Sequence, residues 1–471
     1  MLAAALVAMA ACAVDDIPDG DSVDADPSDF DAKADGVSGT SPVVLAMIDG
    51  AKHRVLVQIS TLADKTLLTH LRDAAKRGVD VHAYLAVSKP AHPASVLAGE
   101  QLEAAGVDLC VVRKTALVGF QIIADDTQLV GTKKVTTASK VTAAAAAFAT
   151  ASAEDVSGTP PSLGTSDTAL MLMPESGPGP IVSLVAGAKA SVDLEIYQLQ
   201  SPAVVAALIA AEQRGVTVRV MLEPKTVGYQ NYKMVAAQLA AAGIMVKATP
   251  PQFDSSHNVD HAKFMVLDGA ELVFGSGNMV RSGLGGNPAG EFCNRDFWIR
   301  DRRTTAVAEA RGLFDADWNR TAAPGLEQLV VTPDNADAKV LALIDAAHTR
   351  LYVYNQSLAD DELEQHLTDA KQRGVDVHVL LGNQPGFGGA PPANQPAIDT
   401  LEAAGITAGY FTTHYLHGKV VVSDDAAFIG SQNFTSGGLG KNREVGEILT
   451  TTTIVDALAA QFATDEAHPA P

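Results

Sequence analysis

Three blocks of apolar and polar segments follow one another from about residue 42 to the C-terminus. Each block contains a short apolar run typical of a strand, then a longer segment typical of a helix, then a second apolar run. The predicted helices begin at Asp or Ser, which are good N-caps, and end in Arg-Gly, which suits a helix C-terminus. The expected strand, helix and strand lie at residues 55–58, 64–77 and 79–85, at 192–198, 201–214 and 216–222, and at 351–356, 360–373 and 375–381. Strands alternating with helices predict an α/β sheet covered by helices.

Composition marks the boundaries between these blocks. Residues 13–41 are rich in Asp, Ser, Gly and Pro and hold few apolar residues, so we expect a solvated, disordered linker there. Residues 153–167 contain Pro-Pro flanked by Gly, Ser and Thr, which indicates a second linker. We therefore predict repeats at residues 42–152, 168–325 and 326–471.

The second and third repeats carry the same chemical motif. Each has His-x-Lys, four further residues, Asp, and a short apolar run that ends in Gly-Ser-x-Asn. His is scarce, with 12 in 471 residues, so two such matches are not expected by chance. Residues two apart on a strand point to the same face, so each His and its Lys should project together. The motif residues are His261, Lys263, Asp268, Ser276 and Asn278, and then His417, Lys419, Asp424, Ser431 and Asn433.

This duplicated motif resembles the phospholipase D superfamily over roughly residues 166 to 471. The resemblance implies a phospholipase D-like fold, in which the second and third repeats pair as a pseudo-dimer around one active site. It also implies a reaction without a metal or cofactor, because one His attacks phosphorus and the other protonates the leaving alcohol. By that resemblance His261 is the nucleophile and His417 the acid. The near-symmetric motifs leave the order open.

The remaining motif positions have expected roles in the same reaction. Lys263 and Lys419 should hold the non-bridging phosphate oxygens, Asn278 and Asn433 should donate hydrogen bonds to them, and Ser276 and Ser431 should add further donors. The resemblance also implies an acidic residue downstream of each motif that orients a His ring. Asn-Arg-Asp and Asn-Arg-Glu sequences occupy that position, which assigns the role to Asp296 and Glu444. We interpret Asp268 and Asp424 as structural.

The first repeat has lost this chemistry. Counting back from Asp125, Val118 occupies the His position and Phe120 the Lys position, while residues 131–134 are Gly-Thr-Lys-Lys. We therefore expect a degenerate repeat that packs on the catalytic pair, binds a partner or covers the site.

Charge limits the possible partners. The formal net charge is −21, of which residues 15–35 contribute −8, which leaves −13 for the rest. An acidic body argues against a nucleic-acid partner, because phosphate backbones are bound by excess Lys and Arg. A phospholipid at a membrane surface is the expected substrate instead.

The N-terminus resembles a bacterial lipoprotein signal. Residues 2–11 are apolar and precede Cys12, the expected lipidated residue, although the stretch is short and no Lys or Arg precedes it. This predicts a protein secreted across the inner membrane and anchored by lipid, in the periplasm or at the cell surface. The alternative is a disordered N-terminus in which Cys12 occurs by chance.

The leading hypothesis is a phospholipase D-type hydrolase that releases phosphatidic acid and a head-group alcohol through a phosphohistidine. One alternative is a cardiolipin synthase-like phosphatidyltransferase, in which an alcohol replaces water as the acceptor. A nuclease of the same superfamily and a non-catalytic surface binding protein are the others. The residues alone do not decide between water and alcohol.

Overall fold

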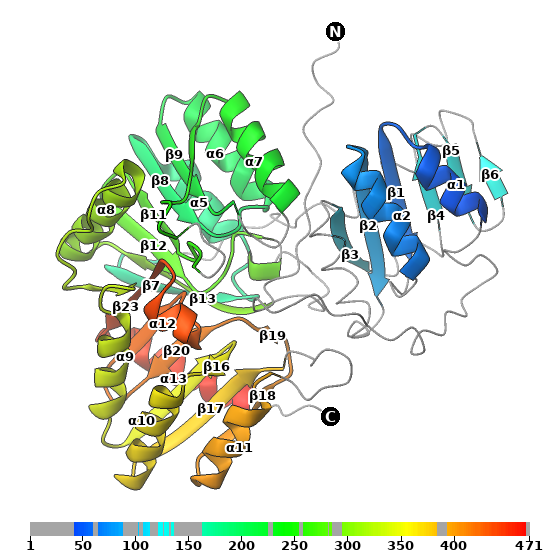
Figure 1. The fold of residues 1–471 in the computed structure, drawn as a ribbon. Coiled ribbons are helices and arrows are strands. Elements are labelled where there is room, and N and C mark those ends of the chain that lie inside the picture. The colour runs from blue at the N-terminus through cyan, green and yellow to red at the C-terminus, as the bar shows by residue number, and fades with distance from the viewer. Residues whose placement is uncertain are drawn as a thin grey trace.

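The computed structural model describes residues 42–59, 65–87, 102, 107–113, 121–125, 127–130, 133–135, 163–224, 229–253, 258–280, 282–284, 294–383 and 393–467. The predicted signal and acidic linker, most of the second linker, Cys12, Val118 and Phe120 lie outside the described residues. Each predicted repeat is built on a mixed sheet, and the third repeat adds one short strand to the sheet of the second. In Figure 1 the strands of the first repeat stand apart, whereas those of the second and third lie close together. The expected α/β class is confirmed.

The first repeat is a sheet with the strand order β3-β2-β1-β4-β5-β6. Strands β1, β2 and β3 run parallel to one another, and β4 pairs with β1 in the antiparallel direction. A small core of its own lies between this sheet and the two helices. The elements are α1 (Pro42–Gly50), β1 (Arg54–Ile59), α2 (Lys65–Lys76), β2 (Asp80–Val87), β3 (Asp108–Arg113), β4 (Gln121–Ala124), β5 (Thr127–Val130) and β6 (Lys133–Val135).

The second repeat has the strand order β10-β9-β8-β11-β12-β13, and β7 pairs with the far side of β13. Its motif strand β11 begins at Lys263. The elements are β7 (Thr168–Met173), α5 (Gly179–Gly187), β8 (Ser191–Ile196), α6 (Pro202–Gln213), β9 (Thr217–Leu222), α7 (Tyr229–Ala241), β10 (Met245–Ala248), β11 (Lys263–Leu267), β12 (Glu271–Gly275), the short 3-10 helix η2 (Ser282–Leu284), β13 (Asn294–Asp301) and α8 (Thr304–Asn319).

The third repeat has the equivalent order, β18-β17-β15-β20-β21-β23-β14. Its motif strand β20 begins at Lys419, in the same register as β11. The elements are β14 (Leu329–Thr332), α9 (Ala336–Asp345), β15 (Arg350–Asn355), β16 (Leu358–Ala359), α10 (Asp361–Gln372), β17 (Asp376–Gly382), α11 (Gln395–Ala403), β18 (Thr407–Phe411), β19 (Tyr415–Leu416), β20 (Lys419–Val422), β21 (Ala427–Gly430), β22 (Phe434–Thr435), α12 (Ser436–Gly440), β23 (Glu444–Leu449) and α13 (Thr452–Glu466).

The motif aspartates fasten the backbone at the start of β8 and β15, and Asp125 fastens the start of β1. Asp268 and Asp424 accept hydrogen bonds from three consecutive backbone N–H groups each, and Asp125 does the same in the first repeat. Burial alone would raise the pKa of these carboxyls, but the N–H donors outweigh it and hold each pKa below its ordinary value. This geometry agrees with the structural role expected for Asp268 and Asp424. The donors belong to residues 52–54, 189–191 and 348–350.

The second and third repeats share one hydrophobic core, which joins them into a single body. Phe297 of β13 packs against Tyr354 of β15, with ring centroids 5.1 Å apart. A Cβ at Gly418 would lie 2.5 Å from the Phe297 ring, which explains why the residue between His417 and Lys419 lacks a side chain. The junction therefore brings the two motif strands close together.

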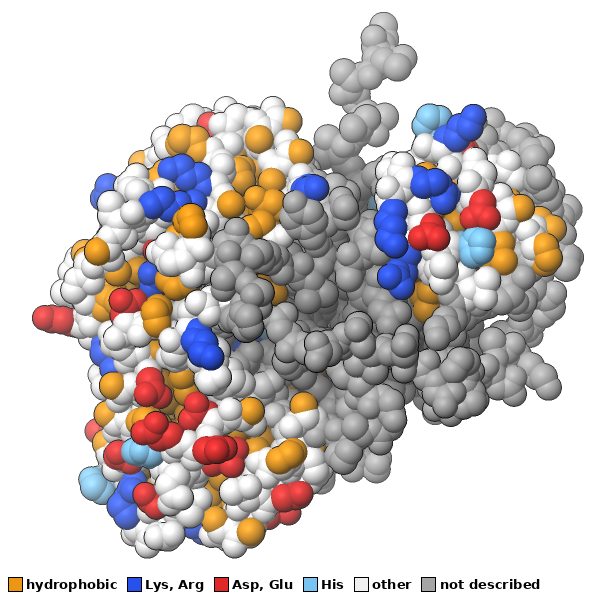
Figure 2. Space-filling model, in the orientation of Figure 1, with side chains coloured by type: hydrophobic (Ala, Val, Ile, Leu, Met, Phe, Trp, Pro, Cys, Tyr) orange, Lys and Arg blue, Asp and Glu red, His pale blue; other side chains and the backbone are white. Residues whose placement is uncertain are grey.

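The surface agrees with the acidic composition. Figure 2 shows Asp and Glu side chains gathered over α9 and α10, and the first turn of α10 alone holds Asp361, Glu362 and Glu364. Among the helices that the structure describes, none is both long enough and apolar enough to cross a bilayer.

Candidate active site

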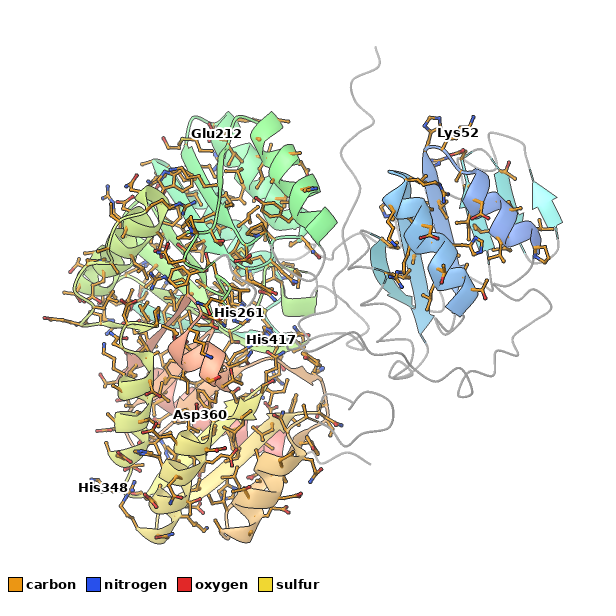
Figure 3. All side chains as sticks on the ribbon, in the orientation of Figure 1. Lys52, Glu212, His261, His348, Asp360 and His417 are labelled. Carbon is orange, nitrogen blue, oxygen red and sulfur yellow. The ribbon has the colours of Figure 1, made fainter. Side chains whose placement is uncertain are left out.

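The two His-x-Lys motifs meet where the second and third repeats join (Figure 3). Short strand β19, which precedes His417, pairs with β13 of the second repeat, and Asp260 forms the matching bridge with Arg443 of the third. As a result the His261 N–H donates to the Arg443 carbonyl at 2.8 Å, and the His417 N–H donates to the Arg295 carbonyl at 3.2 Å. Each catalytic candidate is thus fastened to the other repeat.

The orienting carboxylates also cross between repeats. His261 Nδ1 lies 2.9 Å from Glu444 Oε2 of the third repeat, and His417 Nδ1 lies 3.0 Å from Asp296 Oδ1 of the second. Both carboxylates are fully buried. The sequence predicted these residue types, but it did not show that each carboxylate serves the histidine of the other repeat.

The Asp296 carboxylate keeps its charge despite burial. Burial raises its pKa, but His417, Lys419 and a hydrogen bond from Ser276 lower it, and the net pKa lies below the ordinary value. An ionised carboxylate can only accept, so His417 Nδ1 carries the proton in this contact. The chemistry at His417 therefore falls to Nε2.

Two buried lysines stand beside the histidines. Lys263 and Lys419 have no exposed surface, and each Nζ donates to the carbonyl of its own motif histidine, at 2.8 Å and 2.6 Å. Their other contacts differ, because Lys263 Nζ lies 5.0 Å from the centroid of the Tyr197 ring and Lys419 Nζ donates to Gln356 Oε1 at 2.9 Å. Two enclosed cations are suited to the non-bridging oxygens of a phosphodiester.

The motif asparagines and serines do not share one role. Asn278 is fully buried and donates to Gln198 Oε1 at 3.4 Å, while Asn433 is half-buried after β21. The phosphate-binding role of Ser276 and Ser431 stays a prediction.

Both serine hydroxyls face the neighbouring strand. Ser276 Oγ donates to Asp296 at 2.6 Å and accepts from the Phe297 N–H, and Ser431 Oγ accepts from the Val445 N–H at 3.0 Å. The serine hydroxyls therefore hold β13 and β23, the strands that carry the orienting carboxylates.

Two arginines that sequence reasoning left without a role complete the junction. Arg295 binds Asp465 of α13 at 3.1 Å, and Arg443 binds Asp317 of α8 at 2.9 Å, so each arginine reaches into the other repeat. Both guanidinium groups are nearly buried. The available signal was the Asn-Arg-acid sequence, which places an arginine before each orienting carboxylate.

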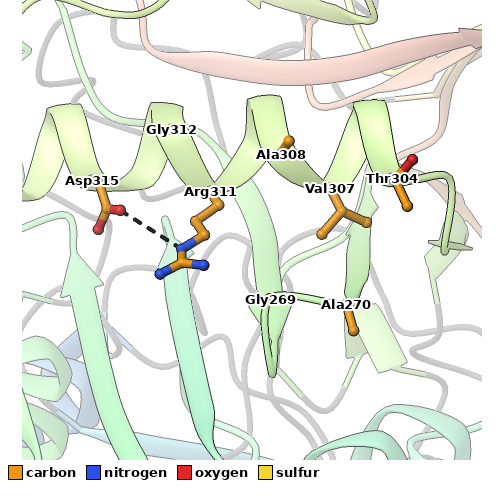
Figure 4. Close-up of a pocket in the computed structure, with 8 residues that line it drawn as sticks. All are labelled: Gly269, Ala270, Thr304, Val307, Ala308, Arg311, Gly312 and Asp315. Atoms are coloured by element: carbon orange, nitrogen blue, oxygen red, sulfur yellow. Dashed lines mark ion pairs between the residues drawn. The ribbon is translucent and has the colours of Figure 1, made fainter.

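One surface hollow of about 330 Å³ lies between α8 and the turn that follows β11 (Figure 4). Its lining includes Gly269, Ala270 and Val307, together with the Arg311–Asp315 pair. This turn is at the opposite end of β11 from Lys263, so we assign the hollow no part in the chemistry.

Comparison with known proteins places the chain in a family. Residues 181–318 and 340–466 match the family model described as "Cardiolipin synthase, PLD-like domain". The match covers more than half of the chain and both motifs, so the chain belongs to this phospholipase D-like family.

Curated relatives give a finer comparison. The chain is 26% identical to the major cardiolipin synthase ClsA of Bacillus subtilis over 292 residues, which are 55% of this chain and 59% of that protein. It is 26% identical to cardiolipin synthase 2 of Bacillus cereus over 290 residues, 55% of each chain. The chain thus spans little more than half the length of the curated relatives it matches.

A solved structure supports the fold. The phosphatidylserine synthase of Haemophilus influenzae superposes with a TM-score of 0.50 at 12% identity, over 64% of this chain and 85% of that one. At this identity the likeness concerns the fold alone, and it confirms the expected phospholipase D-like architecture.

Proposed function

We propose that this protein is a phosphatidyltransferase of the cardiolipin synthase type. It would move a phosphatidyl group from one phospholipid to the alcohol of another through a phosphohistidine. The observation that carries the proposal is the crossed pair of His–carboxylate contacts, with two buried lysines beside them, in a chain whose curated relatives are cardiolipin synthases.

In the first step Nε2 of one histidine attacks phosphorus and the bond to the head-group oxygen breaks. The second histidine gives its proton to the departing oxygen. In the next step the hydroxyl of an acceptor lipid attacks phosphorus, the phosphorus–nitrogen bond breaks, and the second histidine takes the hydroxyl proton. The family resemblance assigns the nucleophile to His261 and the acid to His417, and Lys263 and Lys419 would bind the phosphoryl oxygens throughout.

This proposal reverses the order expected from the sequence, which put hydrolysis first and transfer second. The named relatives favour transfer. Burial favours it too, since His417 has no exposed surface and His261 is only 5% exposed. Enclosing the phosphohistidine limits attack by bulk water and favours an acceptor alcohol held in the site.

Membrane attachment forms a further part of the proposal. A lipid on Cys12 and the acidic segment after it would hold the enzyme near its substrate after secretion across the inner membrane. Mass spectrometry of the protein purified from membranes tests this, because Cys12→Ala should remove the lipid mass and shift the protein to the soluble fraction. An unlipidated Cys12 in membrane-bound protein would contradict it.

The enzymatic proposal is tested by phosphorus-31 NMR and lipid mass spectrometry on vesicles of phosphatidylglycerol with the full chain. Transfer predicts cardiolipin together with released glycerol. The His261→Ala and His417→Ala variants should each form neither. His348→Ala is the matched control, because His348 is an exposed histidine far from the junction (Figure 3) and should leave the rate unchanged.

Other products would change the assignment. Phosphatidic acid in place of cardiolipin would return the assignment to the hydrolase. Unchanged lipids in the wild-type reaction, with the protein folded, would refute the proposal. Cleavage of an oligonucleotide that depends on Lys263 and Lys419 would then favour the nuclease.

A further inference from the structure

Four acidic side chains are buried around the segment that leads into His261. Glu195 lies on β8, Glu223 follows β9, Asp260 precedes His261, and Asp317 lies on α8; none is more than 1% exposed. In the third repeat the positions equivalent to Glu195, Glu223, Asp260 and Asp317 are occupied by Tyr354, Gly382, Leu416 and Asp465, respectively. The third repeat therefore has only one carboxylate at these four positions. The cluster therefore distinguishes the His261 half of the site from the His417 half.

The cation beside this cluster is already engaged. Arg443 binds Asp317 through Nε at 2.9 Å and Asp334 through Nη1 at 2.8 Å. Within the described part of the chain, no Lys, Arg or His forms an ion pair with Glu195 or Asp260. Nor does any group of three or more His, Cys, Asp or Glu among the described residues have the arrangement of a metal site.

The Glu195 and Asp260 carboxyl groups are neighbours within this cluster. They lie within hydrogen-bonding reach, yet both oxygens of Glu195 and Oδ2 of Asp260 are buried without a donor from the described residues. Two acceptors in contact away from water are satisfied only when a proton lies between them. The pair therefore has the geometry of a carboxylic acid bound to a carboxylate.

Asp260 also belongs to a set of bonds that fixes the backbone around His261. The N–H of Asp260 donates to Glu223 Oε2 at 2.8 Å, that of His261 to the Arg443 carbonyl at 2.8 Å, and that of Ala262 to Asp260 Oδ1 at 3.1 Å. Three consecutive N–H groups thus have buried acceptors. Leu416 precedes His417 in the third repeat and has no carboxyl group for the equivalent bond.

We propose that Glu195 and Asp260 share one proton, and that this pair is a positioning unit for His261. The proton lets Asp260 hold the Ala262 N–H with one oxygen and Glu195 with the other. Without it two buried negative charges would face each other, and the segment that carries His261 would move to separate them. The catalytic consequence rests on the proposed function, in which His261 is a reacting group.

The electrostatics support a retained proton. Burial first, and then the charges of Asp260 and Asp317, raise the pKa of Glu195 well above its ordinary value. Burial, and then Glu223 and Asp317, do the same for the pKa of Asp260, with Arg443 opposing. A carboxyl whose pKa is raised by folding stabilises the folded state at pH values below its ordinary pKa. That contribution is lost as the pH rises through the pKa of the folded state. Raising the pH through the folded-state pKa should therefore loosen the pair.

Amide substitutions separate a proton-sharing pair from a pair that acts through charge. In Asp260→Asn the amide can donate to Glu195 while its oxygen still accepts from Ala262, and Glu195→Gln can donate to Asp260. Asp260→Leu copies the third repeat and removes both bonds. We expect kcat to fall no more than about threefold in either amide variant. In Asp260→Leu kcat should fall at least about tenfold with KM little changed, because a misplaced nucleophile lowers the rate of the chemical step.

A second measurement needs no substrate. Thermal unfolding of the full-length wild type should lose stability as the pH rises above the ordinary pKa of a carboxyl group, and Asp260→Asn should lose less. An amide variant as inactive as Asp260→Leu would overturn the positioning role. Equal pH dependence of unfolding in wild type and Asp260→Asn would overturn the shared proton. A folded wild type without lipid activity would refute the proposed function, while the unfolding curves would still decide the shared proton.

Discussion

Replacing Asp296 by Asn should disable a histidine of the other repeat. Asp296 lies on β13 of the second repeat, but its Oδ1 is 3.0 Å from His417 Nδ1 of the third. The substitution keeps the shape of the side chain and removes its charge. His417 would then lose the negatively charged acceptor that fixes both its ring orientation and the proton on Nδ1.

The expected size follows from the contact. A hydrogen bond to a charged group contributes about 1.5–3 kcal/mol. If that contribution is lost in the transition state, the rate falls by about 10- to 150-fold, since each 1.36 kcal/mol is tenfold. Asp296 is fully buried and receives no water in exchange, so we expect the upper part of this range, about 100-fold in kcat.

The assay combines lipid transfer kinetics with nitrogen-15 NMR of the imidazole rings. Asp296→Asn should shift the signals of His417 and leave those of His261 in place. Glu444→Gln should do the reverse, because Glu444 contacts His261 at 2.9 Å. Ser276→Ala is the matched control, since it removes the neutral donor to Asp296 and the acceptor of the Phe297 N–H but leaves the carboxylate beside His417, and it should cost about fivefold or less.

The reasoning fails if Asp296→Asn perturbs His261 and spares His417, because the contacts would then not cross between repeats. A loss of activity smaller than about threefold, with His417 shifted as expected, would show that orientation by Asp296 contributes little to the reaction.

Three further predictions follow from the same geometry. Lys263→Met and Lys419→Met should each lower kcat by about 10²- to 10³-fold in the transfer assay while the protein remains folded, because each removes an enclosed cation from the phosphoryl site; a loss below tenfold would contradict that role. Burial and the charge of Asp301 raise the pKa of Glu447 to about 9, so the wild type should lose stability as pH rises from about 4.5 toward 9, and Glu447→Gln should flatten that dependence in urea unfolding. Asp424→Ala removes the acceptor of three backbone N–H groups and should lower the free energy of unfolding by about 1–3 kcal/mol, measured by denaturant titration, with KM unchanged.

Local features of the fold were readable from the sequence because they depend on near neighbours. The helix expected at residues 201–214 is observed at Pro202–Gln213, and Ser201 caps it by accepting from the Val204 N–H. Asp360 caps α10 in the same way. The duplicated motif predicted the family for a related reason, since His, Lys and Asp at fixed spacing on a strand are visible without any tertiary contact.

The pairing between repeats was not readable. His261 and Glu444 are 183 positions apart, and His417 and Asp296 are 121 apart. Because the two motifs are similar, the sequence allows each carboxylate to contact either histidine. The crossed arrangement is set by two contacts across the junction, the pairing of β19 with β13 and the bridge between Asp260 and Arg443. The contacts of the two motif serines were not readable either, because the sequence does not show that their hydroxyls face β13 and β23.

The crossed contacts make the junction itself a condition for catalysis. A single repeat would keep its own His-Lys pair but lose the carboxylate that orients the histidine and the carbonyl that holds its N–H. The first repeat illustrates the difference between fold and chemistry. Asp125 still fastens the start of β1 as Asp268 and Asp424 fasten β8 and β15, although Val118 and Phe120 replace the reacting residues. The aspartate supports each repeat separately, whereas the reaction requires two repeats that complete each other.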